Sequence, residues 1–570
     1  MLKKRIIKFS AVFALVAILA ACGEDFLNAP AQGSLDEGTL ANQAGAEAAL
    51  ISAYSMLDGW NNNWGQLTPW PTAGSNWVWS SATSDDAYKG SEPGDQGEIS
   101  EIELYNWLPA NPYLESKFKV VYEGAARGNA ALRLLDNALE AGEAIPQEDI
   151  DRITGEVKAL RAHFHFEAVK MWGDVPYYTE NDEDFRKPSG VDPYPFLEAD
   201  LNDAIAVLPE DQAEVGRITQ GAARAYLGKV LLYQGKFAEA KAQFDNVVNS
   251  GKYALQDCYK DIFTAEGENG SEMIFSVQSS VNDGTGGGEN GNFADRLNFP
   301  HGGSPFGCCG FHQPSQNLVN AHKVDANGLP LLDSFNDADY DPATDVVDPR
   351  LDWTVGRDDV PYLDWGIHEP SWIRSRSWAG PYSPKKFAYN VGEESSVGWS
   401  NRQLSPINVP LIRYSDVLLM LAECEVEVGS LERARELVNM IRMRAGNCAQ
   451  GADGNPTTDL ADAGITWATY AVGTYDEAWT DKDVAREAVR FERRLELALE
   501  GHRFFDLRRY GLDYASDILN TYVSEEVGKR SYLSAAATFE SKHMLYPYPS
   551  QQVELSKIDG VEQLTQNPGW

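Results

Sequence analysis

The chain has 570 residues, enough for a large buried core and for more than one ordinary domain. It carries 85 Asp and Glu residues against 48 Lys and Arg residues, a formal net charge of −37. This excess of negative charge argues against a nucleic-acid-binding protein, which needs clustered Lys and Arg to neutralise phosphates.

The first residues have the pattern of a secretory signal and not of folded structure. In residues 1–21 a basic start is followed by an apolar run that is too short for a membrane-spanning helix. The run ends in Leu19–Cys22, which resembles a bacterial lipobox, so we expect Cys22 to be lipidated and to begin the mature protein. An ordinary signal peptide with an incidental cysteine is the alternative. Residues 22–38 would then be the lipid anchor and its tether.

Residues 39–258 form the predicted N-terminal helical part, which one aromatic region interrupts. The stretch Asp58–Leu108 is rich in Trp and Tyr, and its Pro and Gly residues break any periodicity. Elsewhere apolar residues recur at three- and four-residue steps, which is the spacing of one helix face. This spacing predicts helices over Leu40–Leu57, Pro112–Ala141, Asp149–Met171 and Tyr194–Leu208.

The stretch Ile218–Leu255 predicts two amphipathic helices joined at a glycine. Small residues at Gly228 and Ala240 would let the two backbones approach, and Phe244 would fill the groove between them. The spacing resembles a tetratricopeptide repeat, and Tyr414–Arg444 repeats it. Two such pairs predict a helical scaffold with large insertions; two unrelated helical hairpins are the alternative, because this repeat pattern is degenerate.

The pattern changes in residues 259–408, which we predict to be a loop-rich inserted subdomain. Long irregular segments rich in Trp, Pro and Asp surround one short predicted strand, Met273–Val277. Irregular runs of this length inside a compact protein are usually functional. Residues 409–570 return to helices over Ile412–Arg444 and Asp483–Leu507 and are predicted to end in a loop tail.

The six cysteines do not predict a disulfide framework. Five remain after Cys22, and an odd number at irregular spacing is not typical of paired bridges or of a zinc site. The adjacent Cys308 and Cys309 could form a vicinal disulfide or remain two packed thiols. Asp337–Asp341 weakly resembles a calcium loop, but Pro342 follows it and the turn glycine is missing.

No motif predicts a catalytic, cofactor-binding or metal-binding site. The sequence has no glycine-rich phosphate loop, nucleophile elbow or HExxH. Glu487, Glu492 and Glu496 stand at helical spacing with Arg493 and Arg494. That pattern fits ion pairs along one helix better than the paired carboxylates of a glycosidase. We therefore expect no catalytic residue, no cofactor and no bound metal.

Several stretches, taken together and in order, resemble the SusD/RagB family of outer-membrane nutrient-uptake lipoproteins of Bacteroidota. They are Cys22–Leu27, Ser84–Asp86, Glu156–Pro176, the pair in Ile218–Leu255, Asp348–Arg350, Glu487–Gly511 and Pro547–Trp570. The resemblance implies a mainly α-helical fold of four tetratricopeptide-like helix pairs. It also implies a non-catalytic, lipid-anchored protein on the cell surface. Such a protein captures an oligosaccharide or polysaccharide and, as a lid, delivers it to a SusC-like TonB-dependent outer-membrane transporter.

A glycan platform needs ring faces for the C–H surfaces of sugars and polar groups for their hydroxyls. The resemblance implies a platform on loops of the two aromatic regions, without fixing its residues. The candidates are Trp77, Trp79 and Trp107 from the first region, with Asn63 and Asp86 as polar neighbours, and Phe306, Phe311, Trp365, Trp372 and Trp378 from the second. Any one of them could instead be a core residue, since large aromatics are mostly buried.

Two alternatives for the whole chain belong to other functional classes. One is a protein-binding scaffold or lid with no glycan site of its own. The other is a surface glycoside hydrolase, which would need two essential carboxylates in an aromatic cleft.

Overall fold

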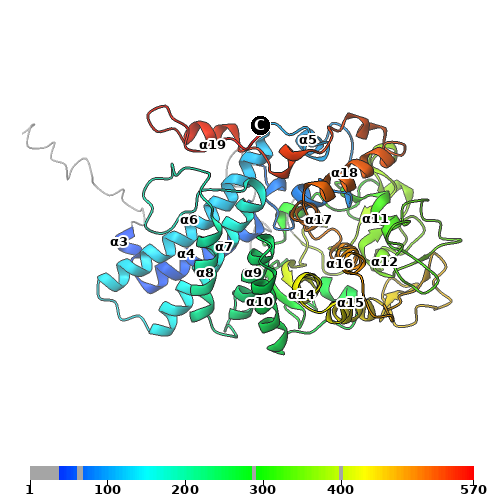
Figure 1. The fold of residues 1–570 in the computed structure, drawn as a ribbon, viewed down its shortest axis with the longest axis horizontal. Helices are drawn as coiled ribbons and strands as arrows, with labels where there is room; N and C mark the ends of the chain where they lie inside the picture. The colour runs from blue at the N-terminus through cyan, green and yellow to red at the C-terminus, as the bar shows by residue number, and fades with distance from the viewer. Residues whose placement is uncertain (1–36, 61–67, 285–289, 397–401) are drawn as a thin grey trace, which may run out of the picture.

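The computed structural model describes residues 37–60, 68–284, 290–396 and 402–570. The predicted signal sequence, Cys22, most of the tether and Asn63 lie outside the described residues. The described part is mainly α-helical, with helices stacked side by side in one half and a loop-rich region in the other (Figure 1). Among the described residues, no helix combines the length and apolarity needed to cross a bilayer.

Four helix pairs form the scaffold, as predicted. α4 packs on α6, α7 on α8, α9 on α10 and α14 on α15. The pairs then stack in series, because α6 also packs on α7, α8 on α9 and α10 on α14. The bounds are α4 (Gln43–Tyr54), α6 (Pro112–Glu140), α7 (Gln147–Trp172), α8 (Tyr194–Val207), α9 (Gln220–Tyr233), α10 (Phe237–Asn249), α14 (Tyr414–Val428) and α15 (Leu431–Ala445).

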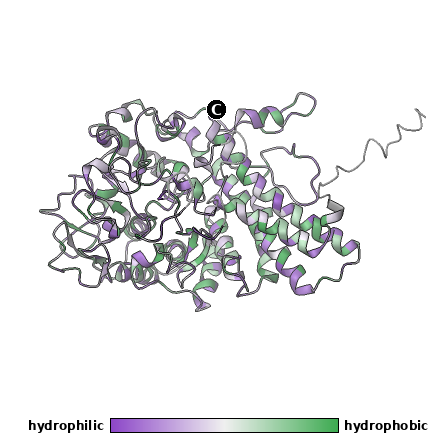
Figure 2. Ribbon diagram, turned by 180° about the vertical axis from the view of Figure 1, so that it is seen from behind, coloured by the Kyte–Doolittle hydropathy of each residue, from purple (hydrophilic) through white to green (hydrophobic). Residues whose placement is uncertain are grey.

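The α9–α10 pair has the packing that its sequence predicts. Thr219 caps the first turn of α9 by accepting a hydrogen bond from the backbone N–H of Ala222. Phe244 of α10 is fully buried, and a Cβ atom placed on Gly228 would lie 2.4 Å from its ring. Gly228 is therefore the residue that lets the Phe244 ring fit against α9. Hydrophobic and hydrophilic residues alternate along these stacked helices, as amphipathic packing requires (Figure 2).

Two expectations about the C-terminal helices are wrong. The predicted helix Asp483–Leu507 is two helices, α16 (Lys482–Leu497) and α17 (Arg503–Arg509). The chain turns between them, because Leu499 and Gly501 adopt positive φ angles of 63° and 78°. The predicted loop tail also contains a 15-residue helix, α18 (Leu512–Glu526).

Six shorter α-helices complete the α-helical elements among the described residues. They are α3 (Glu37–Leu40), α5 (Gly97–Glu103), α11 (Gln316–Ala321), α12 (Arg350–Thr354), α13 (Arg376–Ala379) and α19 (Ser550–Leu555).

The strands are short, and two antiparallel pairs connect distant parts of the chain. β1 (Ala87–Gly90) pairs with β3 (Phe311–Pro314) and so joins the two aromatic regions. β2 (Met273–Val277), which was predicted, pairs with β8 (Val409–Arg413) near the two ends of the loop-rich stretch. The other strands have two residues each: β4 (Lys323–Val324), β5 (Val346–Val347), β6 (Val355–Gly356), β7 (Ser383–Pro384), β9 (Ala449–Gln450), β10 (Pro456–Thr457) and β11 (Thr469–Tyr470).

The apolar core has one large cluster and smaller ones. The large cluster takes residues from α4 to the C-terminal segment, including β2 and β3 of the loop-rich stretch. A second cluster is built entirely within residues 259–407, around Trp353, Tyr362 and Trp372. The loop-rich stretch therefore has a core of its own and also contributes to the main one.

Two disulfides are present in the described chain, so the expectation of no disulfide framework is wrong. Cys258 and Cys448 are bonded across 190 residues of sequence, with their Cα atoms 5.5 Å apart. Cys308 and Cys309 form the vicinal disulfide, which decides between the two alternatives left open by the sequence. Cys424 remains a buried thiol.

Candidate functional site

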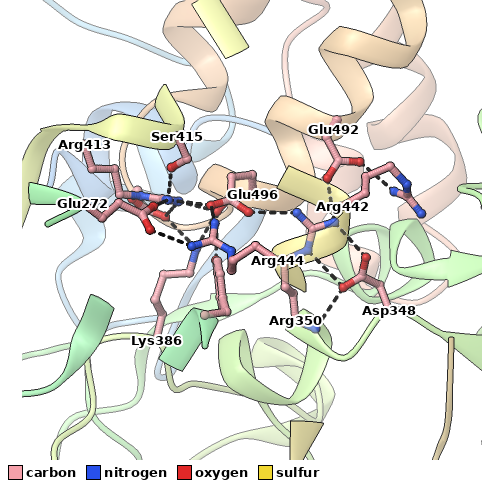
Figure 3. Close-up of polar contacts among 12 residues, drawn as sticks. Glu272, Asp348, Arg350, Lys386, Arg413, Ser415, Arg442, Arg444, Glu492 and Glu496 are labelled. Atoms are coloured by element: carbon pink, nitrogen blue, oxygen red, sulfur yellow. Dashed lines mark hydrogen bonds and ion pairs between the residues drawn. The ribbon is translucent and has the colours of Figure 1, made fainter. Parts of the chain in front are cut away.

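A cluster of charged side chains is buried around α16 (Figure 3). The carboxylate of Glu496 pairs with Arg350 at 2.9 Å, with Arg413 at 2.5 Å and with Arg444. Glu492, one turn earlier, pairs with Arg350 at 2.8 Å and with Arg442 at 2.7 Å. The cluster therefore ties α16 to α12, β8 and α15.

These carboxylates are unsuited to catalysis. A general acid or base needs a pKa near the working pH and access to its substrate. Burial alone would raise the pKa of Glu496, but Arg444, Arg413 and Arg350 together lower it far below its usual range. Both Glu492 and Glu496 are fully buried. The cluster is a structural one, in which every carboxylate is held by arginines.

The ion pairs of α16 run mainly between elements, not along the helix as we predicted. Arg493 pairs with Asp416 of α14 and with Asp506 of α17. Two pairs follow the helix spacing: Glu487 with Arg490 at 3.0 Å, and Asp483 with Arg486 in the first turns. Repeated acidic and basic residues predict a pairing within a helix, but here the partners come from distant segments.

Arg494 and Arg503 hold the acidic pair Asp85–Asp86 of the first aromatic region. Arg503 donates to both oxygens of Asp85 at 2.8 Å, and Arg494 pairs with Asp86 at 3.0 Å. Burial would raise the pKa of Asp85, but Arg494 and Arg503 lower it to about 2. Asp86 is buried together with Asp85, and both carboxylates anchor the fold.

Six of the eight aromatic candidates are buried: Trp77, Trp79, Trp107, Phe306, Phe311 and Trp372. Trp77 contacts Phe311 edge-on at 6.1 Å, so the two aromatic regions meet in the core. Trp79 and Trp107 both pack against Tyr546 of the C-terminal segment. Such side chains present no ring face to solvent in this structure, which differs from the role for which we selected them.

The other two candidates, Trp365 and Trp378, are half-buried. Trp365 contacts Phe306 at 5.0 Å, and the guanidinium of Arg402 lies 5.1 Å from its ring centre. Trp378 stacks on Tyr532 with ring centroids 3.8 Å apart, which covers one of its faces. The structure therefore groups Phe306, Trp365 and Trp372 in the second core cluster and places Trp378 elsewhere.

Three half-buried rings that we did not select gather where α4 ends. Trp60 lines a cleft of about 310 Å³. Its backbone N–H donates to Thr72 Oγ1 at 2.8 Å. Trp70, two residues before Thr72, does not line this cleft but stacks on Phe293 beside it, with centroids 6.1 Å apart and planes 10° apart. We call the cleft lined by Trp60, together with the adjoining ring pair Trp70 and Phe293, the aromatic cleft. It combines a ring from each aromatic region, as the resemblance implies for a platform.

Polar groups line the same cleft. Asp58, Arg127, Gln278 and Asn290 face it together with Trp60. The pKa of Asp58 is raised well above its usual range, first by burial and then by the nearby carboxyl of Asp295. The cleft therefore places an aromatic ring, amide groups and one arginine beside a carboxyl whose pKa is raised.

The sequence does contain a weak signal for these residues. Trp60 precedes a run of three asparagines, and Trp70 stands between Pro69 and Pro71. Such neighbours favour exposed turns. Trp77 and Trp79, in contrast, alternate with Val78 and the small Ser80, which suits a buried segment.

No group of three or more His, Cys, Asp or Glu side chains is placed to hold a metal ion in the parts of the chain that the structure describes. In the loop that weakly resembles a calcium site, Asp341 accepts a hydrogen bond from the N–H of Ala343, which is a turn contact.

Family models and individual relatives of the SusD type match this chain in both its N-terminal and its C-terminal parts. The model of the SusD family matches residues 271–570, more than half of the chain, and a family described as starch-binding associating with outer membrane matches residues 48–232. SusD-like protein P25 of Formosa agariphila is 24% identical over 461 residues, which are 75% of this chain and 74% of that protein. SusD-like protein P38 of the same organism is 25% identical over 394 residues, 65% of this chain and 69% of its own.

Solved structures agree with the fold. A laminarin-binding SusD-like protein is 25% identical, with a TM-score of 0.65 over 93% of this chain and 100% of that one. Surface glycan-binding protein A from Bacteroides thetaiotaomicron, solved with laminarihexaose, has a TM-score of 0.66 at 19% identity over 92% of this chain and 99% of its own. The chain belongs to the SusD family.

Proposed function

We propose that this chain is a cell-surface glycan-binding lipoprotein, which captures an oligosaccharide or polysaccharide at the aromatic cleft. The observation that carries the proposal is the SusD family match, together with the 25% identity to a laminarin-binding SusD-like protein over nearly the whole length of both chains. A neutral glucan is the ligand class that this similarity favours. Burial of a ring by a sugar contributes at most about 1.5–3 kcal/mol, so two or three rings are enough for weak, reversible capture.

The aromatic cleft has the chemistry that the proposal needs. Trp60, Trp70 and Phe293 are half-buried rings, and the amide of Asn290 lines the cleft as a donor and acceptor for hydroxyl groups. The amide of Gln278, in contrast, is hydrogen-bonded to Asn269 and Ser276 within the fold. Trp365 is a further candidate contact, because part of its ring is exposed. The buried candidates Trp77 and Phe311 would then act from behind, by packing the two aromatic regions together.

The second half of the proposal concerns the partner. By family membership, the chain would sit as a lid on a SusC-like TonB-dependent transporter in the outer membrane and deliver the bound glycan to it. The lipid on Cys22 would keep it at the outer surface of that membrane. The chain would bind and not catalyse. The arginine-held carboxylates around α16 are in keeping with this, because they cannot serve as the acid and base of a glycosidase.

Affinity electrophoresis of the soluble chain, begun after Cys22, tests the proposal. Gels that contain laminarin, starch or another polysaccharide should retard the protein without forming product. Product formation would instead support a surface glycoside hydrolase. Normal mobility in every gel, with the transporter still co-purifying from membranes, would favour the alternative of a protein-binding lid with no glycan site.

A further inference from the structure

A second ring-lined cleft, of about 320 Å³, lies along α6 and is bordered by α19 and the 178–185 loop. Phe118, Tyr122, Asn129 and Arg133 line it from one face of α6, at the three- and four-residue steps of a helix. Arg127, which lines the aromatic cleft, projects from another side of the helix, because successive residues are rotated by about 100°. We call this second site the α6 cleft; the two clefts open on different sides of α6.

The rings of the α6 cleft are held in fixed positions. Tyr122 contacts Phe118 at 4.5 Å and Tyr178 edge-on at 5.5 Å. The hydroxyl groups of Tyr122 and Tyr178 already donate to the backbone carbonyls of Pro176 and Phe185. The side chain of Phe185 stands at the rim and is 68% exposed. The rings of Tyr122, Tyr178 and Phe185 therefore remain as apolar surface for C–H groups, while Phe118 is buried behind them and the phenol hydroxyls serve the fold.

Charge at this cleft is balanced. Asp182 pairs with Lys187 at 2.8 Å, and Asp184 pairs with Arg186 at 2.9 Å. In the described part of the chain, Arg133 of the cleft makes no ion pair, and neither does Glu183 on the opposite wall. One guanidinium with five donors and one carboxylate with several acceptor positions suit a neutral ligand that is rich in hydroxyl groups. An anionic ligand would face three carboxylates on the loop.

We propose that the α6 cleft is a second site for a neutral sugar, separate from the aromatic cleft. Ligand pockets usually have volumes of about 300–1,000 Å³, and the α6 cleft lies at the lower end of that range. It would therefore take one end or one short segment of a glycan. The inference rests on the proposed function for its ligand class. Two weak sites on one chain hold a long polymer more strongly than either holds a short oligosaccharide, because the second contact becomes intramolecular.

Fluorine NMR at single positions tests the second site. The soluble chain would carry 4-fluorophenylalanine at position 185, and a matched control would carry it at position 196, an exposed phenylalanine of α8 that does not line the cleft. Each protein is titrated with laminarihexaose and, separately, with maltohexaose. We expect the signal from position 185 to move saturably with at least one of them, and the signal from position 196 to stay unchanged.

Two further variants separate this inference from the proposed function. In the double variant Trp60→Ala, Trp70→Ala, retardation in gels should be weakened while the position 185 signal still titrates. Arg133→Ala should weaken the titration at position 185 about tenfold, because it removes charged donors. If the position 185 signal is silent, or stops responding in the double variant, the second site is refuted and the aromatic cleft stands. If no glycan is bound in any assay, both proposals fail.

Discussion

The sequence did not predict which individual aromatic side chains are buried. Trp60 and Trp77 lie in the same aromatic region and follow no periodic pattern, so only the types of the neighbouring residues, a weak signal, separate the half-buried side chain from the buried one. Trp77 is buried because Phe311, far along the chain, packs against it. Contacts of this kind depend on the tertiary fold, which explains why the regions of the platform were predicted better than its residues.

Glu496 gives the clearest prediction at the residue scale. Glu496→Gln leaves Arg350, Arg413 and Arg444 without a full negative partner in a buried site. Breaking a buried ion pair from one side costs about 3–5 kcal/mol, so the free energy of unfolding should fall by about that amount. Urea unfolding measures it. Glu487→Gln, which alters a half-exposed pair on the same helix, should change the stability by less than about 0.5 kcal/mol. Equal effects of the two variants would refute the structural role of the cluster.

Glu103 predicts a dependence of stability on pH. Its carboxyl accepts from Tyr532 Oη at 2.6 Å and from the N–H of Lys89 at 3.1 Å, and burial raises its pKa to about 7. A raised pKa means that the folded state favours the protonated carboxyl of Glu103. The stabilisation from this group is therefore complete below the unfolded pKa of about 4.3 and is lost as the pH rises through 7. Glu103→Gln has no such loss. Relative to the wild type, it should therefore gain about 2–3 kcal/mol of unfolding free energy between pH 4 and pH 8. An equal difference at both pH values would contradict this assignment.

At the scale of elements, periodic segments were predicted well and irregular ones were not. The bounds of α6 and α8 agree with the predicted helices to within one residue. The break after α16 was missed because its cause is tertiary: Gly501 passes so close to Ser75 that an added Cβ would lie 2.0 Å from the carbonyl oxygen of Ser75. The disulfide between Cys258 and Cys448 was missed for the same reason.

The α9–α10 pair predicts the effect of one methyl group. Gly228→Ala would place a Cβ atom 2.4 Å from the Phe244 ring, inside a fully buried contact. Overpacking of this kind costs about 1–3 kcal/mol. Replacing Gly by Ala inside a helix gains about 1 kcal/mol in helix propensity, so the cost is larger only if the two helices cannot move apart. We expect a net loss of about 1 kcal/mol in urea unfolding. Gly97→Ala in α5 is the control, because its Cβ would meet nothing within 4 Å; it should be neutral or stabilising. A stabilised Gly228→Ala variant would contradict the close packing.

At the scale of the whole molecule, the ordered set of motifs predicted the family and the mainly α fold, and both are confirmed. The set is informative because its pieces, such as Ser84–Asp86 and Glu487–Gly511, meet in the structure. Asp85 and Asp86 of the first piece are held by Arg494 and Arg503 of the second. The family pattern thus records contacts of the folded chain.

The lipid anchor is a prediction about the whole molecule and its membrane. Cys22→Ala removes the thiol that would take the lipid, and the folded part offers no helix, among its described residues, that could replace it in a bilayer. In cells that make the wild type as a membrane-bound, palmitate-labelled protein, the variant should lose the label and leave the membrane fraction. Labelled or firmly bound Cys22→Ala protein would refute the anchor.

The aromatic cleft carries the central claim, and calorimetric titration of the soluble chain with the oligosaccharide selected by the gels tests it most directly. Loss of one platform ring should cost about 1.4 kcal/mol or more, so Trp70→Ala should bind about tenfold more weakly or not at all. Trp378→Ala, which removes a half-buried ring outside the cleft, should bind like the wild type. Unchanged affinity of Trp70→Ala, or an equal loss in both variants, would contradict the account.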